Sequence, residues 1–131
     1  MARVTGLNHV TLAVSDLERS VAFYRDRLGG RLAARWPKGA YLEMGALWLC
    51  LDLHDEMRAR ADDTHLAFTA DDYDALAGAL ADLPRWKENV SEGASLYLLD
   101  PDGHKLEIHA GDLASRLAHY RAHPEKGVTI F

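Results

Sequence analysis

The chain has little cysteine, no basic stripe and no long apolar stretch, and each shortage excludes a class of protein. Cys50 is the only cysteine among 131 residues, so no disulfide can form within the chain, which fits a reducing compartment. Lysines and arginines number 15 against 20 acidic residues and form no run, so we expect no nucleic-acid partner. No apolar stretch approaches the roughly 20 residues that cross a bilayer, and the N-terminus has no apolar signal core. We therefore expect a cytoplasmic protein without a membrane partner.

The residues that are present have the composition of a globular domain. Apolar residues make up 48% and charged residues 27%, and the length suffices to bury a core without disulfides. We expect a single domain over residues 1–131. It would contain one module at about 5–55, a second at about 62–110, and a C-terminal helix and tail over 111–131.

The two modules show the same order of patterns. Residues 7–14 alternate as a strand does, and apolar residues then recur at helical spacing over 17–28. Residues 64–70 repeat the strand, and helical spacing follows over 73–83. The residues just before each helix are good N-caps. The pattern predicts the α+β class, built from paired βαβββ modules that form a curved mixed sheet. The further strands are expected at 32–36, 40–45, 47–53, 95–100 and 104–109.

Two histidines and a glutamate occupy matching faces of these strands. His9 and His65 stand at equivalent places in the two modules, each at the start of a predicted strand. Glu107 lies on a strand whose opposite face is aliphatic, and burying a carboxylate without a partner is costly. Two imidazoles and a carboxylate suit Mn²⁺, Fe²⁺, Zn²⁺ or Ni²⁺. We predict a divalent metal site at these three residues, although a single strand histidine is more often solvated or satisfied within the core.

The repeat also shows where a fourth ligand is missing. The first-module counterpart of Glu107 falls near Cys50 or Leu51, and neither is a carboxylate. Three protein ligands with open positions are typical of a catalytic metal. We expect Cys50 itself to pack in the core, between leucines.

A polar loop precedes the strand pair that carries Glu107. On composition alone, residues 87–95 predict a solvated surface loop. However, Lys87, Tyr97 and Arg116, with a serine of the loop, have the chemistry to hold a phosphate-like group by charge-assisted hydrogen bonds.

With these residues assembled, the chain resembles the vicinal oxygen chelate superfamily, and within it the FosA-type fosfomycin-resistance glutathione transferases. The resemblance covers nearly the whole chain. The segment DPDGHKLE (100–107) is common across the superfamily and is therefore the least specific match. The most specific matches are the loop WKENVSEGASLY (86–97) and the strand segment GALWLCL (45–51). The matching segments include GLNHVTLAV (6–14), AYLEMGALWLCL (40–51), THLAF (64–68), WKENVSEGASLY (86–97) and LDPDGHKLE (99–107).

The resemblance implies a role for each candidate residue. Mn²⁺ would be bound by His9, His65 and Glu107, with Thr11 contacting the substrate beside its epoxide oxygen. The phosphonate of fosfomycin would lie against Lys87, Ser91, Tyr97 and Arg116, in a pocket lined by Trp48 and Tyr41. An activating K⁺ would lie in a loop formed by Asn89, Ser91, Gly93 and Ser95.

The resemblance further implies a reaction and an assembly. Glutathione would open the epoxide of fosfomycin and inactivate the antibiotic, in a domain-swapped homodimer with active sites shared between chains. Departures at Lys38, Asp52 and Asp63 concern the thiol, so bacillithiol or cysteine stay open as donors in place of glutathione. Three further functions also stay open: an epoxide hydrolase, an extradiol-type dioxygenase and a metal-free antibiotic-binding protein. For His109, two roles stay open: it could bind the metal directly, or, as we favour, it could support a metal ligand without touching the metal.

Overall fold

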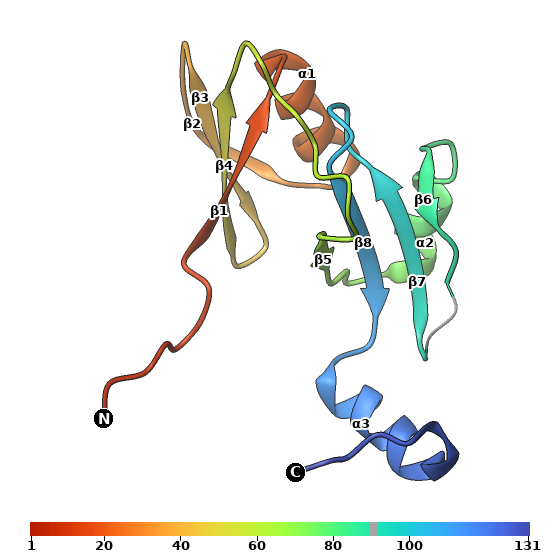
Figure 1. Ribbon diagram of the computed structural model, residues 1–131. Coiled ribbons are helices and arrows are strands. Elements are labelled where there is room, and N and C mark those ends of the chain that lie inside the picture. Colours follow the sequence, from red (N-terminus) through yellow and green to blue (C-terminus); the bar gives the residue numbers. More distant parts are fainter. Residues whose placement is uncertain (90–91) are drawn as a thin grey trace. The chain divides into compact units, whose positions relative to one another are not determined.

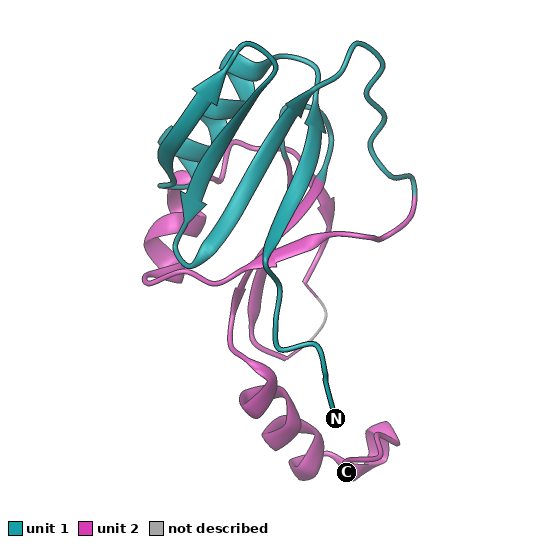
Figure 2. Cartoon of the chain, turned by 90° about the vertical axis from the view of Figure 1, so that its left-hand side faces the viewer, with its two compact units in different colours: residues 1–61, 100–104 teal, residues 62–99, 105–131 magenta. Residues whose placement is uncertain are grey.

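The computed structural model describes residues 1–89 and 92–131, so Ser91 lies outside the described residues. The chain divides into two compact units, coloured separately in Figure 2. The first contains Met1–Ala61 together with Asp100–His104, and the second contains Asp62–Leu99 and Lys105–Phe131. In the described parts of the chain, no helix is both long and apolar enough to cross a membrane.

The first unit is a four-stranded mixed sheet with one helical segment (Figure 1). The strand order is β1-β4-β3-β2, with β1 parallel to β4 and the other neighbours antiparallel. Asp16 caps α1 because its carboxylate accepts from the Arg19 N–H, 3.0 Å away. The helix continues into a π-helical segment, η1, before the chain enters β2. The elements are β1 (His9–Val14), α1 (Leu17–Ala22), η1 (Phe23–Arg27), β2 (Arg31–Trp36), β3 (Gly39–Met44) and β4 (Leu47–Leu53).

The second unit repeats this topology with the strand order β5-β8-β7-β6. Again the first strand of the unit pairs in parallel with the last, and the other neighbours are antiparallel. Asp72 caps α2 by accepting from the Ala75 N–H, as Asp16 does for α1. The elements are β5 (Leu66–Phe68), α2 (Tyr73–Ala79), β6 (Arg85–Lys87), β7 (Ala94–Leu99), β8 (Lys105–Ala110), α3 (Leu113–Ala122) and the short 3₁₀ segment η2 (Pro124–Lys126).

In both units the helix covers the aliphatic face of the sheet. In the first, α1 packs on β3 and β4, where Leu42, Leu49 and Leu51 are fully buried. In the second, α2 packs on β8, where Leu106 and Ile108 are buried. This burial is the main stabilising contribution of each unit. Because side chains alternate along a strand, the opposite face carries the polar residues.

Each unit has an irregularity at the same place in the repeat. The pairing of β2 with β3 shifts register between Leu32 and Ala34, and that of β6 with β7 shifts between Arg85 and Lys87. An extra residue in one strand changes which side chains face the same way beyond it. In the second unit, the shift pairs Lys87 with Tyr97, so these two side chains share a face.

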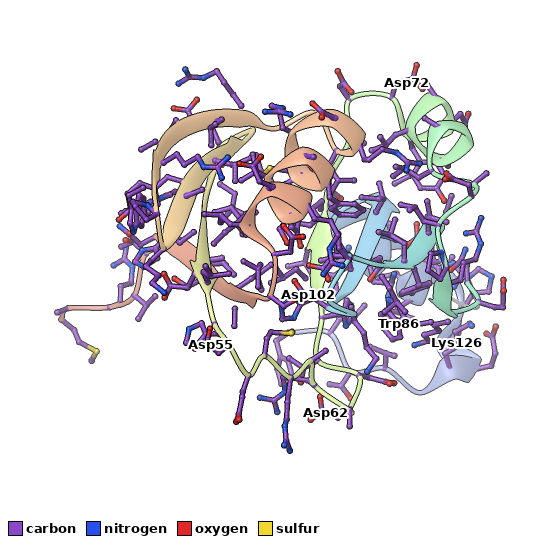
Figure 3. The ribbon with its side chains drawn as sticks, turned by 90° about the horizontal axis from the view of Figure 1, so that it is seen from above. Asp55, Asp62, Asp72, Trp86, Asp102 and Lys126 are labelled. Atoms are coloured by element: carbon purple, nitrogen blue, oxygen red, sulfur yellow. The ribbon has the colours of Figure 1, made fainter. Side chains whose placement is uncertain are left out.

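The turn between β7 and β8 belongs to the first unit. The backbone N–H of Gly103 donates to the carbonyl of Asp100 across 3.0 Å, as the Asp-Pro-Asp-Gly sequence predicts. Oδ1 of Asp100 accepts from the N–H groups of Asp102 and His104, and Oδ2 accepts from the hydroxyl of Tyr24. Asp102, labelled in Figure 3, accepts from the backbone N–H and the hydroxyl of Ser15.

The predicted α+β class and paired modules are confirmed, with two corrections to the elements. Helical spacing predicts a second helix that reaches residue 83, but α2 ends at Ala79 and turns follow. Alternation predicts His65 within the strand, but β5 begins at Leu66, so His65 precedes it. The single-domain boundaries and the domain-swapped homodimer stay predictions.

Candidate metal and anion site

Several of the predicted residues share the polar face of the second sheet. Glu107 on β8 pairs with Tyr97 on β7, and Tyr97 pairs with Lys87 on β6. One step further along β7 and β8, Ser95 pairs with His109. Paired residues point to the same side of a sheet, so a carboxylate, a phenol, an ammonium, a hydroxyl and an imidazole converge there.

His65 and Glu107 form the centre of this arrangement. Nδ1 of His65 lies 2.7 Å from the carbonyl oxygen of Asp63, which can only accept, so Nδ1 carries the hydrogen. In a neutral imidazole, Nε2 then has a lone pair, and it lies 3.0 Å from Oε1 of Glu107. Two acceptors this close are stabilised by a cation that both can share, either a second proton on His65 or a metal ion.

Glu107 is held from its other side. It is only 8% exposed, and its Oε2 accepts from the hydroxyl of Ser95 across 2.6 Å. The same hydroxyl oxygen lies 2.6 Å from Nδ1 of His109. Oε1 therefore faces His65 while Oε2 is occupied within the protein. This arrangement leaves one defined oxygen of the carboxylate for a cation.

Aromatic side chains surround the His65–Glu107 pair. The ring centroid of Trp86 lies 5.2 Å from those of both His65 and Tyr97. The indole N–H of Trp86, labelled in Figure 3, donates to the carbonyl of Leu106 across 2.9 Å, which fixes its orientation. The ammonium of Lys87 lies 5.4 Å from the centroid of the Tyr97 ring. The rings of Trp86 and Tyr97 therefore form an apolar surface beside the ammonium of Lys87 and the carboxylate of Glu107.

Arg116 is engaged by the loop that precedes β7. Its Nε donates to Oε2 of Glu92 across 3.0 Å, and its Nη2 donates to the backbone carbonyl of Glu92 across 3.2 Å. The hydrogen bond to Glu92 raises the pKa of the Arg116 guanidinium. In the same loop, the side-chain amide of Asn89 donates to the carbonyl of Gly93. The guanidinium also forms a hydrogen bond with the Tyr120 side chain, so an anion would have to use its remaining N–H donors.

The remaining predicted residues lie together in the first unit. His9 pairs with Trp48, Thr11 pairs with Cys50, and Cys50 also pairs with Tyr41, so all share the face opposite α1. The rings of His9 and Trp48 are 4.5 Å apart, and those of Tyr41 and Trp48 are 5.1 Å apart. Cys50 is buried, at 7% exposed, as expected of a core residue.

His9 resembles His65 in having an oxygen partner on its Nδ1. Its Nδ1 lies 2.7 Å from the side-chain oxygen of Asn8, which leaves Nε2 as the ring nitrogen available to a ligand. An oxygen partner on one ring nitrogen is the usual support of a metal-binding histidine. Among the described residues, no group of three or more His, Cys, Asp or Glu side chains has the arrangement of a metal site.

Among the described residues, the predicted ones thus fall into two sets. The first unit holds His9, Thr11, Tyr41 and Trp48, and the second holds His65, Lys87, Asn89, Gly93, Ser95, Tyr97, Glu107 and Arg116. Sequence reasoning missed Trp86 and Glu92 as contributors. Trp86 begins the matching segment 86–97, but nothing in the sequence indicates the register shift between Arg85 and Lys87. Glu92 is one acid of a polar loop, and no local pattern links it to Arg116.

The fold and this site define the class of protein. The family model described as the Glyoxalase/Bleomycin resistance protein/Dioxygenase superfamily matches residues 6–108. That span includes both histidines, Glu107 and nearly all of both four-stranded sheets. The chain belongs to this superfamily.

Particular relatives narrow the comparison. The glutathione transferase FosA of Serratia marcescens is 53% identical over 95% of this chain and 94% of its own length. The metallothiol transferase FosB of Shouchella clausii is 41% identical over 89% of this chain and 88% of its own. Among solved structures, the fosfomycin resistance protein FosX of Listeria monocytogenes in complex with Mn(II) and sulfate has a TM-score of 0.73 and 31% identity. The match covers 90% of this chain and 99% of that one.

Proposed function

We propose that the chain is a metal-dependent thiol transferase that opens the epoxide of fosfomycin with glutathione. The single observation that carries the proposal is the His65–Glu107 pair, which lies on one sheet face with Lys87 and Tyr97. The 53% identity to a glutathione transferase FosA over nearly the whole chain supports the same reaction.

The donor atoms fit a divalent first-row ion. His65 presents the lone pair of Nε2 because its Nδ1 is bound to a carbonyl, and Glu107 presents Oε1 because its Oε2 is bound to Ser95. Imidazole and carboxylate together are suitable ligands for Mn²⁺. The FosX structure that contains Mn(II) supports this choice of metal. When bound, such an ion supplies Lewis-acid stabilisation to an oxygen that gains negative charge.

The chain's own residues would bind and orient the antibiotic. Lys87 neutralises one phosphonate charge, and Tyr97 adds a hydroxyl donor on the same sheet face. Arg116, which Glu92 and Tyr120 hold in place, offers its remaining N–H donors. Ser91, which lies outside the described residues, stays a proposed contact. A substrate held at a fixed position presents its epoxide carbon to the thiolate in one orientation, which contributes to the rate enhancement.

The first unit would complete the site. We propose that His9 is the third metal ligand, that Thr11 contacts the substrate, and that Trp48 and Tyr41 line the pocket. Their shared sheet face and the open Nε2 of His9 support these roles. The K⁺ loop of Asn89, Ser91, Gly93 and Ser95 is proposed from the resemblance, as is activation by K⁺.

We further propose a homodimer in which His9 of the partner subunit joins His65 and Glu107. Exposed apolar side chains on and beyond α3 support an interface: Leu113 is 72% exposed and Val128 is 43% exposed. Mixing two inactive variants tests the sharing. In a heterodimer of His9→Ala and His65→Ala chains, one of two shared sites is intact, so remixing restores about a quarter of wild-type sites. No recovery in a verified heterodimer would refute shared sites.

Turnover of fosfomycin tests the reaction itself. Purified protein is stripped of metal, and product is measured with and without Mn²⁺, with and without K⁺, and with glutathione, cysteine, bacillithiol or water. We expect Mn²⁺-dependent transfer with glutathione as the preferred donor. His65→Ala should abolish turnover, whereas His54→Ala, a change at a histidine outside both sets, should not. Full activity of His65→Ala would refute the site.

A further inference from the structure

His109 lies in a space that two glycines provide. A Cβ on Gly93 would lie 2.7 Å from the carbonyl oxygen of Ala110 and 3.0 Å from Cε1 of the His109 ring. A Cβ on Gly111 would lie 3.0 Å from Nε2 of the same ring. Both glycines also have positive φ, +78° and +145°, which side-chain-bearing residues rarely adopt. The backbone on both sides of the imidazole therefore holds its ring in one place.

The hydrogen bonds of this ring have a defined direction. The carboxylate of Glu107 can only accept, so the single hydroxyl hydrogen of Ser95 goes to its Oε2. The Ser95 oxygen must then accept from His109, whose Nδ1 lies 2.6 Å away. Nδ1 also lies 3.5 Å from Oε2 of Glu107, which is beyond the usual length of a hydrogen bond, so Ser95 is its main partner. Nδ1 of His109 therefore carries a hydrogen. With the hydrogen on Nε2 instead, Ser95 would face two acceptors with one hydrogen, and one acceptor would lose its bond.

We propose that His109 is a positioning residue, which acts through Ser95 to hold Glu107 with Oε1 turned toward His65. It does not itself contact metal or substrate. Its Nδ1–H orients the Ser95 hydroxyl, and that hydroxyl occupies Oε2. The role in metal binding rests on the proposed function, since it gives Glu107 its ligand geometry.

The hydrogen-bond direction is testable without any metal. The ¹⁵N chemical shifts of the imidazole nitrogens in metal-free protein distinguish the two neutral tautomers of His109, assigned with a His109→Asn sample. We expect the Nδ1–H form. An Nε2–H form would overturn the proposed relay, meaning the hydrogen bonds from His109 to Ser95 and from Ser95 to Glu107, whatever the protein's activity is.

Affinity for Mn²⁺ tests the consequence. An Asn side chain carries an amide N–H₂ at about the position of Nδ1, whereas Leu has similar bulk and no donor. Free Mn²⁺ is followed by electron paramagnetic resonance during titration of wild type, His109→Asn and His109→Leu. We expect His109→Leu to bind about 10- to 100-fold more weakly, as is usual when support behind a ligand is lost. His109→Asn should remain within a fewfold of wild type. Equal affinities for Leu and wild type, or equal losses for Asn and Leu, would overturn the proposal.

A second variant guards against a folding effect. Ser95→Ala removes the same relay from the other side, so adding His109→Leu to it should cause little further loss of Mn²⁺ affinity. Fully additive losses would mean that the two residues act separately, and the proposal would fall. Circular dichroism of each variant shows whether it is folded. If wild type binds no Mn²⁺ while His109 shows the Nδ1–H form, the proposed function fails and the relay itself stands.

Discussion

Replacing Tyr24 by Phe removes one hydroxyl from the core of the first unit and keeps the shape of the ring. Tyr24 is 0% exposed, and its hydroxyl donates across 2.7 Å to Oδ2 of Asp100, itself 5% exposed. Asp100 keeps two backbone donors on Oδ1, so the change costs one hydrogen bond to a buried charged group. We expect a loss of about 2–3 kcal/mol in the free energy of unfolding. For a chain of this length, the corresponding fall in Tm is roughly 6–12 °C.

The pH dependence of this loss has a definite sign. Burial, and then the charge of Asp100, raise the pKa of Tyr24 well above its usual value of 10.0. An unfolded tyrosine ionises near that usual value, whereas the folded one stays protonated. The stabilising contribution is therefore complete below about pH 10 and is lost as the pH rises further, by up to about 1.4 kcal/mol per pH unit. The difference between wild type and Tyr24→Phe should shrink above about pH 10.

Urea unfolding, followed by circular dichroism, measures both quantities. Wild type and Tyr24→Phe are compared at about pH 8 and at several values up to about pH 11, with the slope m checked for constancy. Tyr41→Phe, at a half-buried tyrosine on β3, serves as the control for a general effect of removing a phenol on stability. Equal stabilities at about pH 8, or a gap that stays constant to about pH 11, would refute the reasoning.

Three further predictions concern binding and stability. Lys87→Ala should raise the KM for fosfomycin roughly ten- to a hundredfold, because a charge-assisted hydrogen bond to the phosphonate is lost. The control Lys126→Ala, on η2, should leave the KM unchanged. Similar KM values for the two variants would show that Lys87 does not bind the substrate. Glu92→Gln should increase the affinity for inorganic phosphate about two- to fivefold in a competition assay, because the negative charge that competes for Arg116 is gone. Weaker phosphate binding would mean that Glu92 chiefly orients the guanidinium. Gly78→Ala on α2, where a Cβ meets nothing within 4 Å, should raise the free energy of unfolding by about 0.5–1 kcal/mol, and a lower midpoint in urea would contradict that.

The parts of the fold that follow local rules were predictable. Alternation along the strands correctly places His9 with Thr11 and puts Glu107 opposite aliphatic neighbours. The capping residues Asp16 and Asp72 mark the starts of both helices. These features depend on side-chain periodicity and on short-range hydrogen bonds, both of which are visible in one sequence.

The parts that depend on long-range geometry were not predictable. The register shift that turns Lys87 toward Tyr97 arises from strand pairing, and no residue type marks it. The bonds of Ser95 to both Glu107 and His109 require three side chains from two strands to meet. The resemblance assigns Ser95 to the K⁺ loop, and nothing local indicates that its hydroxyl also contacts the carboxylate. Roles of this kind appear only when the sheet is assembled.

The placement of the β7–β8 turn has a consequence for dissecting the chain. Asp100–His104 belongs to the first unit, yet the strands on either side of it belong to the second. A fragment ending at Ala61 would therefore keep Tyr24 but lack its acceptor, and the complementary fragment would carry Asp100 without its phenol. No single cut separates the two repeats into complete pieces. A substitution at Asp100, late in the sequence, would consequently destabilise the core that the first strands and helix build.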